Sequence, residues 1–438
     1  MLVPHIMSGQ TVGVLGLGYS GMAAVASLHA AGVSIFAHDD RKPDNTPLQG
    51  TVMAWQNWPW RDLDALVISP GIPHLHPAPH PAAARAAEEN IEILSEVEIA
   101  LRAVPKAPMV VITGTNGKST TAALVGHCLQ EAGEDVAVGG NIGRAACSLD
   151  DPGPNGVIVL ELSSYQLETT HSLSPIIAVV LNITPDHLDR HAGMAGYVAA
   201  KNRALTALCT NGTAILGQSD DQVKQLADAC KNRGIRTLLA MPDEAPAGRN
   251  HCQALHGNHN AENAAAAGLV LHCLGLNVDQ INHSMASFSG LPHRLQTVAA
   301  MGPIRFVNDS KATNGSAAAK AVAAYSNIYW IAGGLAKEDG LDAVIPHIRN
   351  VEKAYLIGSS AAAFAEKLCG HCHANIYENL HEATHAAFDD AKDNVNGGTI
   401  LLAPAAASFD QFENFGTRGD EFCQLAKKLC SQKVEADV

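Results

Sequence analysis

The sequence contains few charged or aromatic residues, and one sign of charge prevails. Charged residues make up 16% of the chain and aromatic residues 5%, and 43 acidic residues against 29 Lys and Arg give a net charge of −14. Nucleic acids and anionic membranes are bound through clustered Lys and Arg, so we expect neither as a partner. No apolar run reaches the roughly 18 residues of a membrane span, and residues 1–10 lack the features of a secretory signal. We therefore expect a cytoplasmic protein without membrane insertion.

The ten cysteines follow no regular spacing. In a large chain this is typical of reduced thiols and not of a disulfide framework. Cys369 and Cys372 form a C-x-x-C pair flanked by His371 and His373, so a metal site is conceivable there. No second cysteine pair stands at zinc-finger spacing, which disfavours a structural zinc site.

The chain is long enough for several domains, because 438 residues exceed the usual size of a domain with a single hydrophobic core. Its hydrophobic content is 47%. Apolar, β-branched runs alternate with Ala-rich helical patterns, which predicts an α/β protein with doubly wound parallel sheets. We expect a Rossmann-like domain at 1–96, a central P-loop ATPase-like domain at 97–290 and a C-terminal Rossmann-like α/β domain at 291–438.

The expected strands belong to these three segments, and one helical stretch at 81–104 precedes a boundary marked by Pro105 and Pro108. The strands are expected at 12–15, 33–39 and within 64–72; at 109–113, 157–161, 177–182 and 213–217; and at 304–308, 328–334, 353–359 and 399–405.

A glycine motif follows the first strand. Residues 16–21 read Gly-Leu-Gly-Tyr-Ser-Gly, which is G-x-G-x-x-G between a strand and a helix. In that context the glycines let the backbone approach a diphosphate, and the helix N-terminus faces the anion. Asp39 lies 18 residues after Gly21, close to the place of a ribose-binding acid. The motif favours a diphosphate ligand without saying which one, and a purely structural turn is the alternative.

A second motif, Gly-Thr-Asn-Gly-Lys-Ser-Thr at 114–120, is shorter than the standard phosphate loop, which would place a glycine at Ile112. Its N–H groups, Lys118 and Ser119 can still hold phosphate and Mg²⁺. Glu161 and His187 follow the next two strands, and the carboxyl ends of parallel strands meet at one edge. Alone, Glu161 could be a structural acid at a strand end, and His187 could be a helix cap. Together they predict phosphoryl transfer, and the polar strand ends of the third segment suggest two substrates joined with ATP.

Two other function classes remain open at this point. An NAD-dependent oxidoreductase would explain the first glycine motif, but it would leave the Lys118 loop unexplained. A nucleotide-regulated binding module without turnover is disfavoured by the set of Lys118, Glu161 and His187.

The order of the motifs resembles the Mur ligases of bacterial cell-wall synthesis, relatives of folylpolyglutamate synthases. The matching stretches, from Gly16 to Phe415, include GTNGKST, ELSSYQLE, NITPDHLDRH, YVAAK, GNHNAENAAAA, GLPHR, NDSKATN and ASFDQFENF. A folylpolyglutamate synthase is disfavoured because it has no Rossmann-like N-terminal domain. The resemblance implies a three-domain ligase, expected to be a monomer, that joins D-glutamate to UDP-N-acetylmuramoyl-L-alanine. It also implies ATP, two Mg²⁺ ions and CO₂ held as a lysine carbamate.

The resemblance also assigns roles to residues. The catalytic positions are Lys118, Glu161, His187 and Lys201, and the metal positions are Ser119, Glu161, His187 and Lys201, the last as its carbamate. The ATP positions are Gly114, Thr115, Asn116, Gly117, Lys118, Ser119, Thr120, Asn263, Arg294 and Asp309. The positions for the UDP substrate are Gly18, Tyr19, Ser20, Asp39, Arg41, Ser69, Asn141 and Ser163, although Tyr19 and Asp40 depart from the family's pattern. The positions for D-glutamate are Lys311, Thr313, Lys337, Ser408 and Phe415. Without the resemblance, Lys201 would be interpreted as a solvated helix lysine.

Overall fold

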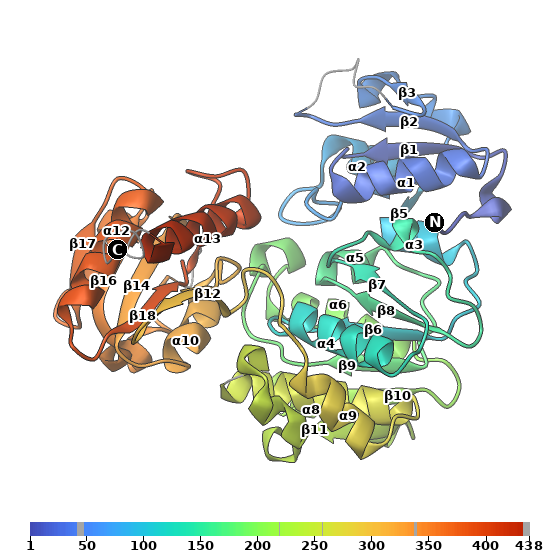
Figure 1. Cartoon of the computed structure of the whole chain (residues 1–438). Coiled ribbons are helices and arrows are strands. Elements are labelled where there is room, and N and C mark those ends of the chain that lie inside the picture. The colour runs from blue at the N-terminus through green and yellow to red at the C-terminus, as the bar shows by residue number, and fades with distance from the viewer. Residues whose placement is uncertain (42–47, 219, 256, 337–339, 432–438) are drawn as a thin grey trace. The chain divides into compact units, whose positions relative to one another are not determined.

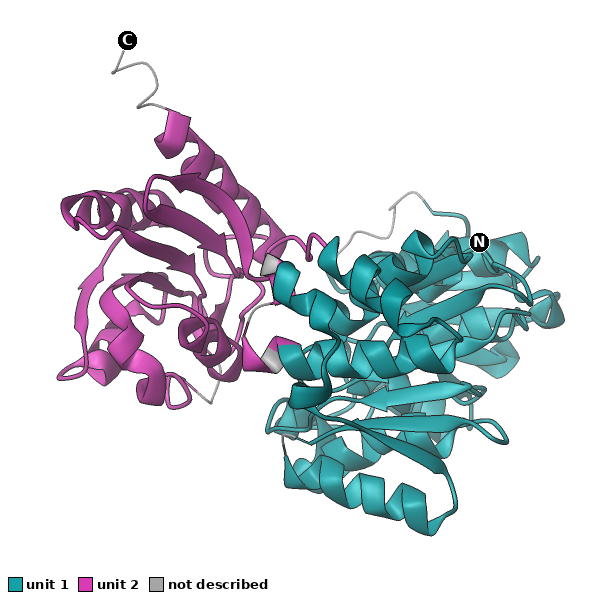
Figure 2. Cartoon of the chain, turned by 60° about the horizontal axis from the view of Figure 1, so that its bottom comes forward, with its two compact units in different colours: residues 1–251, 261–287 teal, residues 252–260, 288–438 magenta. Residues whose placement is uncertain are grey.

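The structure is a computed structural model that describes residues 1–41, 48–218, 220–255, 257–336 and 340–431. Helices alternate with strands along the chain (Figure 1), and most strands are parallel, so the expected α/β class is confirmed. The chain forms two compact units, 1–251 with 261–287 and 252–260 with 288–438 (Figure 2). Unit 1 contains two sheets and unit 2 a third, while the domain boundaries near residues 96 and 290 stay predictions.

The first sheet of unit 1 has five parallel strands in the order β3-β2-β1-β4-β5. Its central strand, β1, pairs with β2 on one side and β4 on the other and is buried from Val12 to Leu15. The strands are β1 Thr11–Leu15, β2 Ser34–His38, β3 Thr51–Val52, β4 Ala65–Ile68 and β5 Glu92–Leu94, and the helices are α1 Tyr19–Ala30, α2 Pro81–Glu88 and α3 Glu96–Leu101.

The second sheet of unit 1 has six parallel strands in the order β11-β10-β9-β6-β8-β7. β6, β8 and β9 lie side by side and are buried along their whole length. Their C-terminal ends therefore deliver three loops to one edge. The strands are β6 Met109–Thr113, β7 Val136–Gly140, β8 Val157–Glu161, β9 Ile177–Val180, β10 Thr213–Gly217 and β11 Arg236–Ala240, and the helices are α4 Lys118–Glu131, α5 Ser164–Glu168, α6 Met194–Thr206, α7 Asp221–Asn232, α8 Asn258–Cys273 and α9 Val278–Ala286.

The sheet of unit 2 has the order β12-β13-β18-β14-β16-β17, with β12 antiparallel to β13 and the other pairs parallel. A two-stranded antiparallel ribbon joins β15 and β19. The strands are β12 Gln296–Met301, β13 Ile304–Asn308, β14 Ile328–Gly333, β15 Leu335–Ala336, β16 Val351–Ile357, β17 His373–Ile376, β18 Gly398–Leu402 and β19 Ala406–Ala407, and the helices are α10 Gly315–Ala323, α11 Ala361–Leu368, α12 Leu380–Asp393 and α13 Phe415–Ser431.

Each strand expected from a buried apolar run is present, whereas the strands that the sequence did not reveal lie at sheet edges or in the small ribbon. Edge strands such as β11 and β17 are partly exposed, so they carry no continuous apolar run. The single helical stretch at 81–104 was wrong, because β5 separates α2 from α3 there. Asn90 adopts a left-handed backbone (φ 57°) just after α2, and β5 then pairs with β4.

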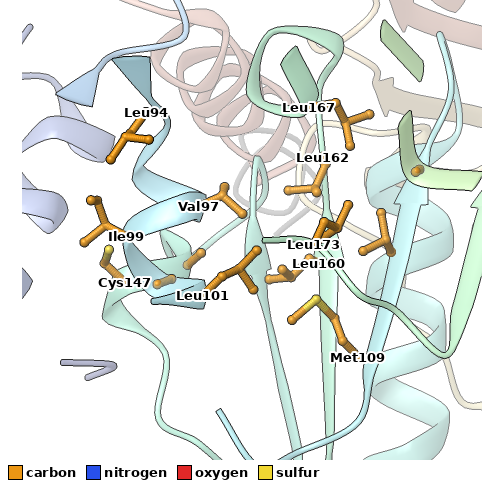
Figure 3. Close-up of a cluster of buried hydrophobic side chains, with 14 of the residues drawn as sticks. Leu94, Val97, Ile99, Leu101, Met109, Cys147, Leu160, Leu162, Leu167 and Leu173 are labelled. Carbon is orange, nitrogen blue, oxygen red and sulfur yellow. The ribbon is translucent and has the colours of Figure 1, made fainter. Parts of the chain in front are cut away.

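Helix α3 joins the two sheets of unit 1 in one hydrophobic core. All six of its residues are buried, and Ser95 caps its N-terminus by accepting a hydrogen bond from the N–H of Glu98. Val97 and Ile99 belong to a cluster that continues to Met109 and Leu160 of the second sheet (Figure 3). This shared core explains why the two sheets form one compact unit.

The described residues contain no helix with the length and apolar character needed to cross a bilayer. All ten cysteines are free thiols, as expected. Within the same described ranges, no group of three or more His, Cys, Asp or Glu side chains could hold a metal ion by itself. The metal site considered at Cys369 and Cys372 therefore has no support.

The glycines of the first motif serve different purposes. A Cβ on Gly21, in the first turn of α1, would lie 1.9 Å from the carbonyl oxygen of Gly16, whereas a Cβ on Gly18 would meet nothing within 4 Å. The hydroxyl of Ser69 donates to the same Gly16 oxygen at 3.0 Å, which ties the loop after β4 to the turn. Gly21 therefore permits close packing of helix on turn, while Gly18 faces open space.

The substitution Gly21→Ala is expected to destabilise unit 1, because the new methyl group must displace the turn. Overpacking of this kind costs about 1–3 kcal/mol. Urea unfolding of the purified variant measures the loss, and Gly18→Ala is the matched control, expected to change the midpoint little. Equal midpoints for the two variants would contradict this packing role of Gly21.

Candidate active site

The loop after β6, residues 114–118, is held in place by the end of β9. The N–H of Thr115 donates to the carbonyl oxygen of Asn182 at 2.7 Å, and the N–H of Asn116 donates to the Asn182 side-chain oxygen at 2.8 Å. The Asn182 amide nitrogen donates back to the Asn116 carbonyl at 3.0 Å. The loop is therefore preformed, and it leads directly into α4, whose N-terminus is suited to an anion. The sequence placed Asn182 at a strand end but gave it no role.

Gly117 caps α4 in the left-handed conformation, with φ 88°. A Cβ there would lie 2.2 Å from the side-chain oxygen of Asn263, which is itself buried on α8. The structure therefore brings Asn263 against the loop from a distant part of the chain. Ser119 and Thr120 lie in the first turn of α4, as the motif predicts.

Two lysine amines share one backbone oxygen at this loop. Lys118 Nζ donates to the carbonyls of Gly114 and Thr115, each at 2.9 Å, and Lys201 Nζ donates to the same Gly114 carbonyl at 2.8 Å. Lys201 is 1% exposed, so its interpretation as a solvated lysine from the bare sequence was wrong. Lys201 is buried because it lies on the side of α6 that packs against the protein core. Its amine lies 4.6 Å from the centre of the Tyr197 ring.

The charge state of Lys201 follows from this environment. Burial, and then the neighbouring charge of Lys118, lower the pKa of Lys201 well below its usual value, while Asp186 and Glu161 act in the opposite direction. Burial disfavours the charged form of an amine, so Lys201 is readily neutral. The sequence did not predict this contribution of Asp186.

Glu161, at the end of β8, is 1% exposed. Its Oε1 accepts a hydrogen bond from Asn141 Nδ2 at 2.8 Å, while its Oε2 is buried and has no hydrogen-bond partner among the described residues. The side-chain nitrogen of Asn116 is in the same situation. A buried carboxylate oxygen without a partner is costly unless a ligand or cation meets it. Oxygen donors of this kind fit Mg²⁺, which usually takes one or two carboxylates and completes its shell with phosphate and water.

His187 and Ser163 lie on the neighbouring loops. His187 has a left-handed backbone (φ 55°), and its Nε2 lies 3.5 Å from Asp186 Oδ2. Ser163 caps α5 through a reciprocal pair of hydrogen bonds with Gln166. The three loops after β6, β8 and β9 thus carry Lys118, Glu161 and His187 at one sheet edge, as expected.

The positions expected for the UDP substrate in the first sheet follow β1, β2 and β4. Gly18, the N-cap of α1, and Tyr19 are exposed, and Ser20 is partly buried. Asp39 is engaged by the protein itself, because its two oxygens accept hydrogen bonds from the N–H groups of Leu17 (2.6 Å) and Arg41 (2.9 Å). Asp39 therefore shapes the glycine turn, a structural task that the sequence did not reveal.

In unit 2, the loops after β13 and β18 lie side by side, because the N–H of Ala405 donates to the carbonyl of Ala312 at 2.9 Å. Lys311 places its amine 4.0 Å from the centre of the Phe415 ring, so two of the expected D-glutamate positions meet. Ser408 is 2% exposed, and its hydroxyl has no partner among the described residues.

Two further expected positions have different outcomes. Thr313 lies on the same loop as Lys311, and its N–H donates to the Lys311 carbonyl at 2.8 Å. Lys337 lies outside the described residues.

The side chain of Arg418 connects these two loops, and the sequence did not predict this role. It is 1% exposed, and its guanidinium donates to Ser310 Oγ and to the carbonyls of Ser310 and Ala406 at 3.0–3.1 Å. Burial lowers the pKa of Arg418 to about 10. Only the NFGTRG context near the start of α13 could have pointed to it, and that context does not distinguish a buried arginine from an exposed one.

Asp309, an expected ATP position at the end of β13, is buried beside Arg294. Burial raises the pKa of Asp309 to about 7, although the charge of Arg294 and a hydrogen bond from the N–H of Leu295 (3.2 Å) oppose this change. The carboxyl group is therefore poised to change its charge near neutral pH.

The comparisons with known proteins identify the class of this chain as a ligase. Residues 112–253 match the model of the Mur ligase middle domain, and residues 293–406 match that of the Mur ligase glutamate ligase domain. The chain belongs to the Mur ligase family.

Within this family, the chain is similar to D-glutamate ligases from two bacteria. A UDP-N-acetylmuramoylalanine–D-glutamate ligase from Phenylobacterium zucineum is 40% identical over 98% of both chains, and one from Paramagnetospirillum magneticum is 41% identical over 98% of both.

Solved structures show the same fold at much lower sequence identity. UDP-N-acetylmuramate–alanine ligase MurC from Thermotoga maritima has a TM-score of 0.59 at 15% identity, over 98% of this chain and 100% of the other. The MurF ligase of the same organism, solved in complex with ADP, has a TM-score of 0.59 at 15% identity, over 99% and 98%.

The substitution Asp309→Asn is expected to remove a pH-dependent loss of stability in unit 2. A carboxyl with a raised native pKa ionises first in the unfolded chain, so wild-type stability falls as pH rises from about 4 to about 7. The variant should therefore be more stable than the wild type at pH 8, by about 2–4 kcal/mol, and similar near pH 4.

Protection of the β13 and β18 amides from hydrogen exchange at both pH values measures this difference. Asp389→Asn, at an exposed residue of α12, is the control that should leave the pH dependence unchanged. A variant that loses stability with pH as the wild type does would show that Asp309 titrates normally.

Proposed function

We propose that the protein is an ATP-dependent ligase that adds D-glutamate to UDP-N-acetylmuramoyl-L-alanine in peptidoglycan precursor synthesis. The observation that carries the proposal is the strand-edge cluster of the second sheet, where the phosphate loop, two lysines and a buried carboxylate meet. The substrates are suggested by relatives at about 40% identity that bear this activity in their names. ATP and a UDP-sugar substrate also suit a cytoplasmic enzyme, and we propose that it acts as a monomer.

The proposed reaction has two steps. The alanine carboxylate attacks the γ-phosphorus of ATP, the bond to ADP breaks, and an acyl phosphate forms. The amine of D-glutamate then attacks the acyl carbon, loses a proton, and phosphate departs as the C–O bond breaks. The first step brings two anions together, so positive charge at the site is the main requirement.

The residues of the central site fit this requirement. The N–H groups at the start of α4 and the Lys118 ammonium hold the β- and γ-phosphates, and Asn182 keeps their loop rigid. Ser119, Glu161 and His187 would hold Mg²⁺, and Glu161 Oε2, which has no hydrogen-bond partner among the described residues, supports this. When bound, Mg²⁺ neutralises phosphate charge.

Lys201 is proposed to work as a carbamate. Its amine is buried, has a lowered pKa and shares an acceptor with Lys118, and a neutral amine is the form that adds CO₂. The neutral amine forms an N–C bond to CO₂ as one C=O bond opens, and it releases one proton, so that a neutral group becomes an anionic carbamate. This anion would suit a second Mg²⁺ and would offset the charge of Lys118.

The remaining substrate groups are proposed to bind at the other strand edges. The UDP moiety lies at the start of α1, with Gly18, Tyr19, Ser20, Asp39, Arg41 and Ser69, and the muramoyl part lies near Asn141 and Ser163. Asn263 is proposed to contact ATP, and Arg294 and Asp309 are further ATP positions that the family resemblance implies. D-Glutamate binds at Lys311, Thr313, Ser408 and Phe415. There a lysine and the buried Ser408 hydroxyl, which has no partner among the described residues, offer partners for its carboxylates. Lys337 completes that proposal.

Phosphate release is expected only with ATP, Mg²⁺, UDP-N-acetylmuramoyl-L-alanine and D-glutamate together. The substitution Lys118→Ala should lower turnover by about 100–1000-fold, because it removes a charge that stabilises the transferring phosphoryl group. Lys224→Ala, at an exposed lysine that pairs with Asp221 in the same unit, is the control and should remain active. A preference for L-alanine or L-lysine over D-glutamate would contradict the proposed substrate. Full activity of Lys118→Ala would contradict the assignment of the phosphate loop.

The carbamate predicts chemical rescue. Lys201→Ala should be nearly inactive and should regain part of its activity when a small carboxylate such as formate occupies the vacated space. Lys118→Ala, which lacks a cation and not an anion, should show no rescue by formate. Steady-state rates with and without formate make the test, and full activity of Lys201→Ala without it would refute the carbamate.

A further inference from the structure

The turn after β9 that carries His187 has an unfavourable backbone. Residues 187–193 include the short helix η5 (Leu188–His191), and both His187 (φ 55°) and Ala192 (φ 53°) adopt the left-handed conformation. Such conformations are costly for residues with a side chain, and they persist only where surrounding contacts impose them. The question is which contacts hold this turn.

His191, at the end of the turn, is tied to helix α5 by both of its ring nitrogens. Its Nε2 lies 2.9 Å from Ser164 Oγ, and its Nδ1 lies 2.9 Å from Glu168 Oε1. The side chain is fully buried. With the Glu168 carboxylate accepting from the protonated Nδ1, Nε2 is left to accept from the Ser164 hydroxyl.

Tyr165, between these two anchors on α5, extends the contact to His187. Its ring stacks on the ring of His191, with 5.2 Å between centres and an angle of 11°, and it lies 5.2 Å from the ring of His187. The guanidinium of Arg190 covers the ring of Tyr165 at 4.5 Å. His187 and His191 are thus packed on the same aromatic ring.

We infer that His191 is a positioning residue for His187: it locks the turn after β9 onto α5 and so fixes His187 for the ligase reaction. This inference rests on the proposed function, since it gives His187 a place in that chemistry. His191 acts through the turn and through Tyr165, and it has no chemical step of its own.

The same network reaches the loop after β4 in the first sheet. Glu168 Oε2 lies 3.8 Å from His74 Nε2, and Arg190 donates to the carbonyl of Gly71 at 3.0 Å. Loosening the turn should therefore also disturb binding of the UDP substrate. His191 also packs on Tyr197, with 5.3 Å between ring centres, and the Tyr197 hydroxyl lies 3.1 Å from Thr115 Oγ1 of the phosphate loop. The phosphate loop should keep its place as long as a ring remains at position 191, because Asn182 also holds this loop.

The test is the substitution His191→Phe, which keeps a ring of similar volume against Tyr165 but removes both hydrogen bonds. We expect kcat to fall by about 100-fold, the effect that a misplacement of about 1 Å can have. The KM for UDP-N-acetylmuramoyl-L-alanine should rise, and the KM for ATP should stay within about twofold of the wild-type value. The crystal structure of the variant should show His187 displaced.

His127→Phe is the matched control. His127 also hydrogen-bonds, through its Nε2 to Ser284 (3.1 Å) and Ser287 (2.9 Å), but it lies outside the site, so its loss should affect stability and not kcat. If His191→Phe changes kcat no more than this control does, or leaves His187 unmoved, the positioning role is wrong.

A milder variant keeps the test decisive if His191→Phe does not fold. Ser164→Ala removes only the bond to Nε2 and should lower kcat by about threefold to tenfold, as the loss of one hydrogen bond implies. Wild-type kcat in Ser164→Ala would then overturn the inference. Absence of D-glutamate-dependent turnover in the wild type would refute the proposed function instead, and the crystal structures of the variants would still show whether His191 positions His187.

Discussion

Two lysine amines converge on the carbonyl oxygen of Gly114, and the electrostatics of the site depend on this crowding. Two ammonium groups on one acceptor repel each other, and the buried one, Lys201, lacks the hydration that would stabilise its charge. Burial and the neighbouring charge of Lys118 therefore both lower the pKa of Lys201. Moving either lysine by one helical turn would separate the two amines, because the position of each amine depends on where its helix, α4 or α6, begins.

That relation exists because three fully buried strands end together. β6 supplies the Gly114 carbonyl and the start of α4, β8 supplies Glu161, and β9 supplies Asn182, which clamps the loop. A shift by one residue would exchange the side chains that pack on the two buried faces of the sheet, and it would move the strand ends relative to one another. The position of each charged group is thus fixed by the packing of apolar residues that take no part in the chemistry.

The sequence predicted the interior of the fold better than its margins. Strands such as 109–113 could be located because burial on both faces demands a continuous apolar run, whereas β11 and β17, exposed at sheet edges, left no such pattern. The glycine motif likewise predicted the turn before α4, where Gly117 adopts a left-handed conformation. The tertiary environment could not be predicted in this way, because burial of Lys201 depends on which face of α6 meets the sheet.

The same limit applies to residues that serve the site indirectly. The hydrogen bonds of Asp39 to backbone N–H groups and the buried guanidinium of Arg418 depend on segments far apart in sequence. A lone acid after a strand, or a lone arginine in a helix, has many possible surroundings, so its residue type alone predicts none of them. Known motifs predict the residues that would bind ligands. They say little about the supporting residues, such as Asp39 and Arg418, that hold the binding residues in place.

The short segment 252–260 belongs to unit 2, although unit 1 precedes and follows it in the chain. Its attachments are specific: the Cys252 thiol donates to the Phe288 carbonyl at 2.9 Å, and Gly290 lies so close to Ala254 that a Cβ there would come within 2.7 Å of it. Helix α8 begins in this segment and continues into unit 1. A single genetic crossover between relatives near residue 287 would therefore separate 252–260 from its contacts with Phe288 and Gly290.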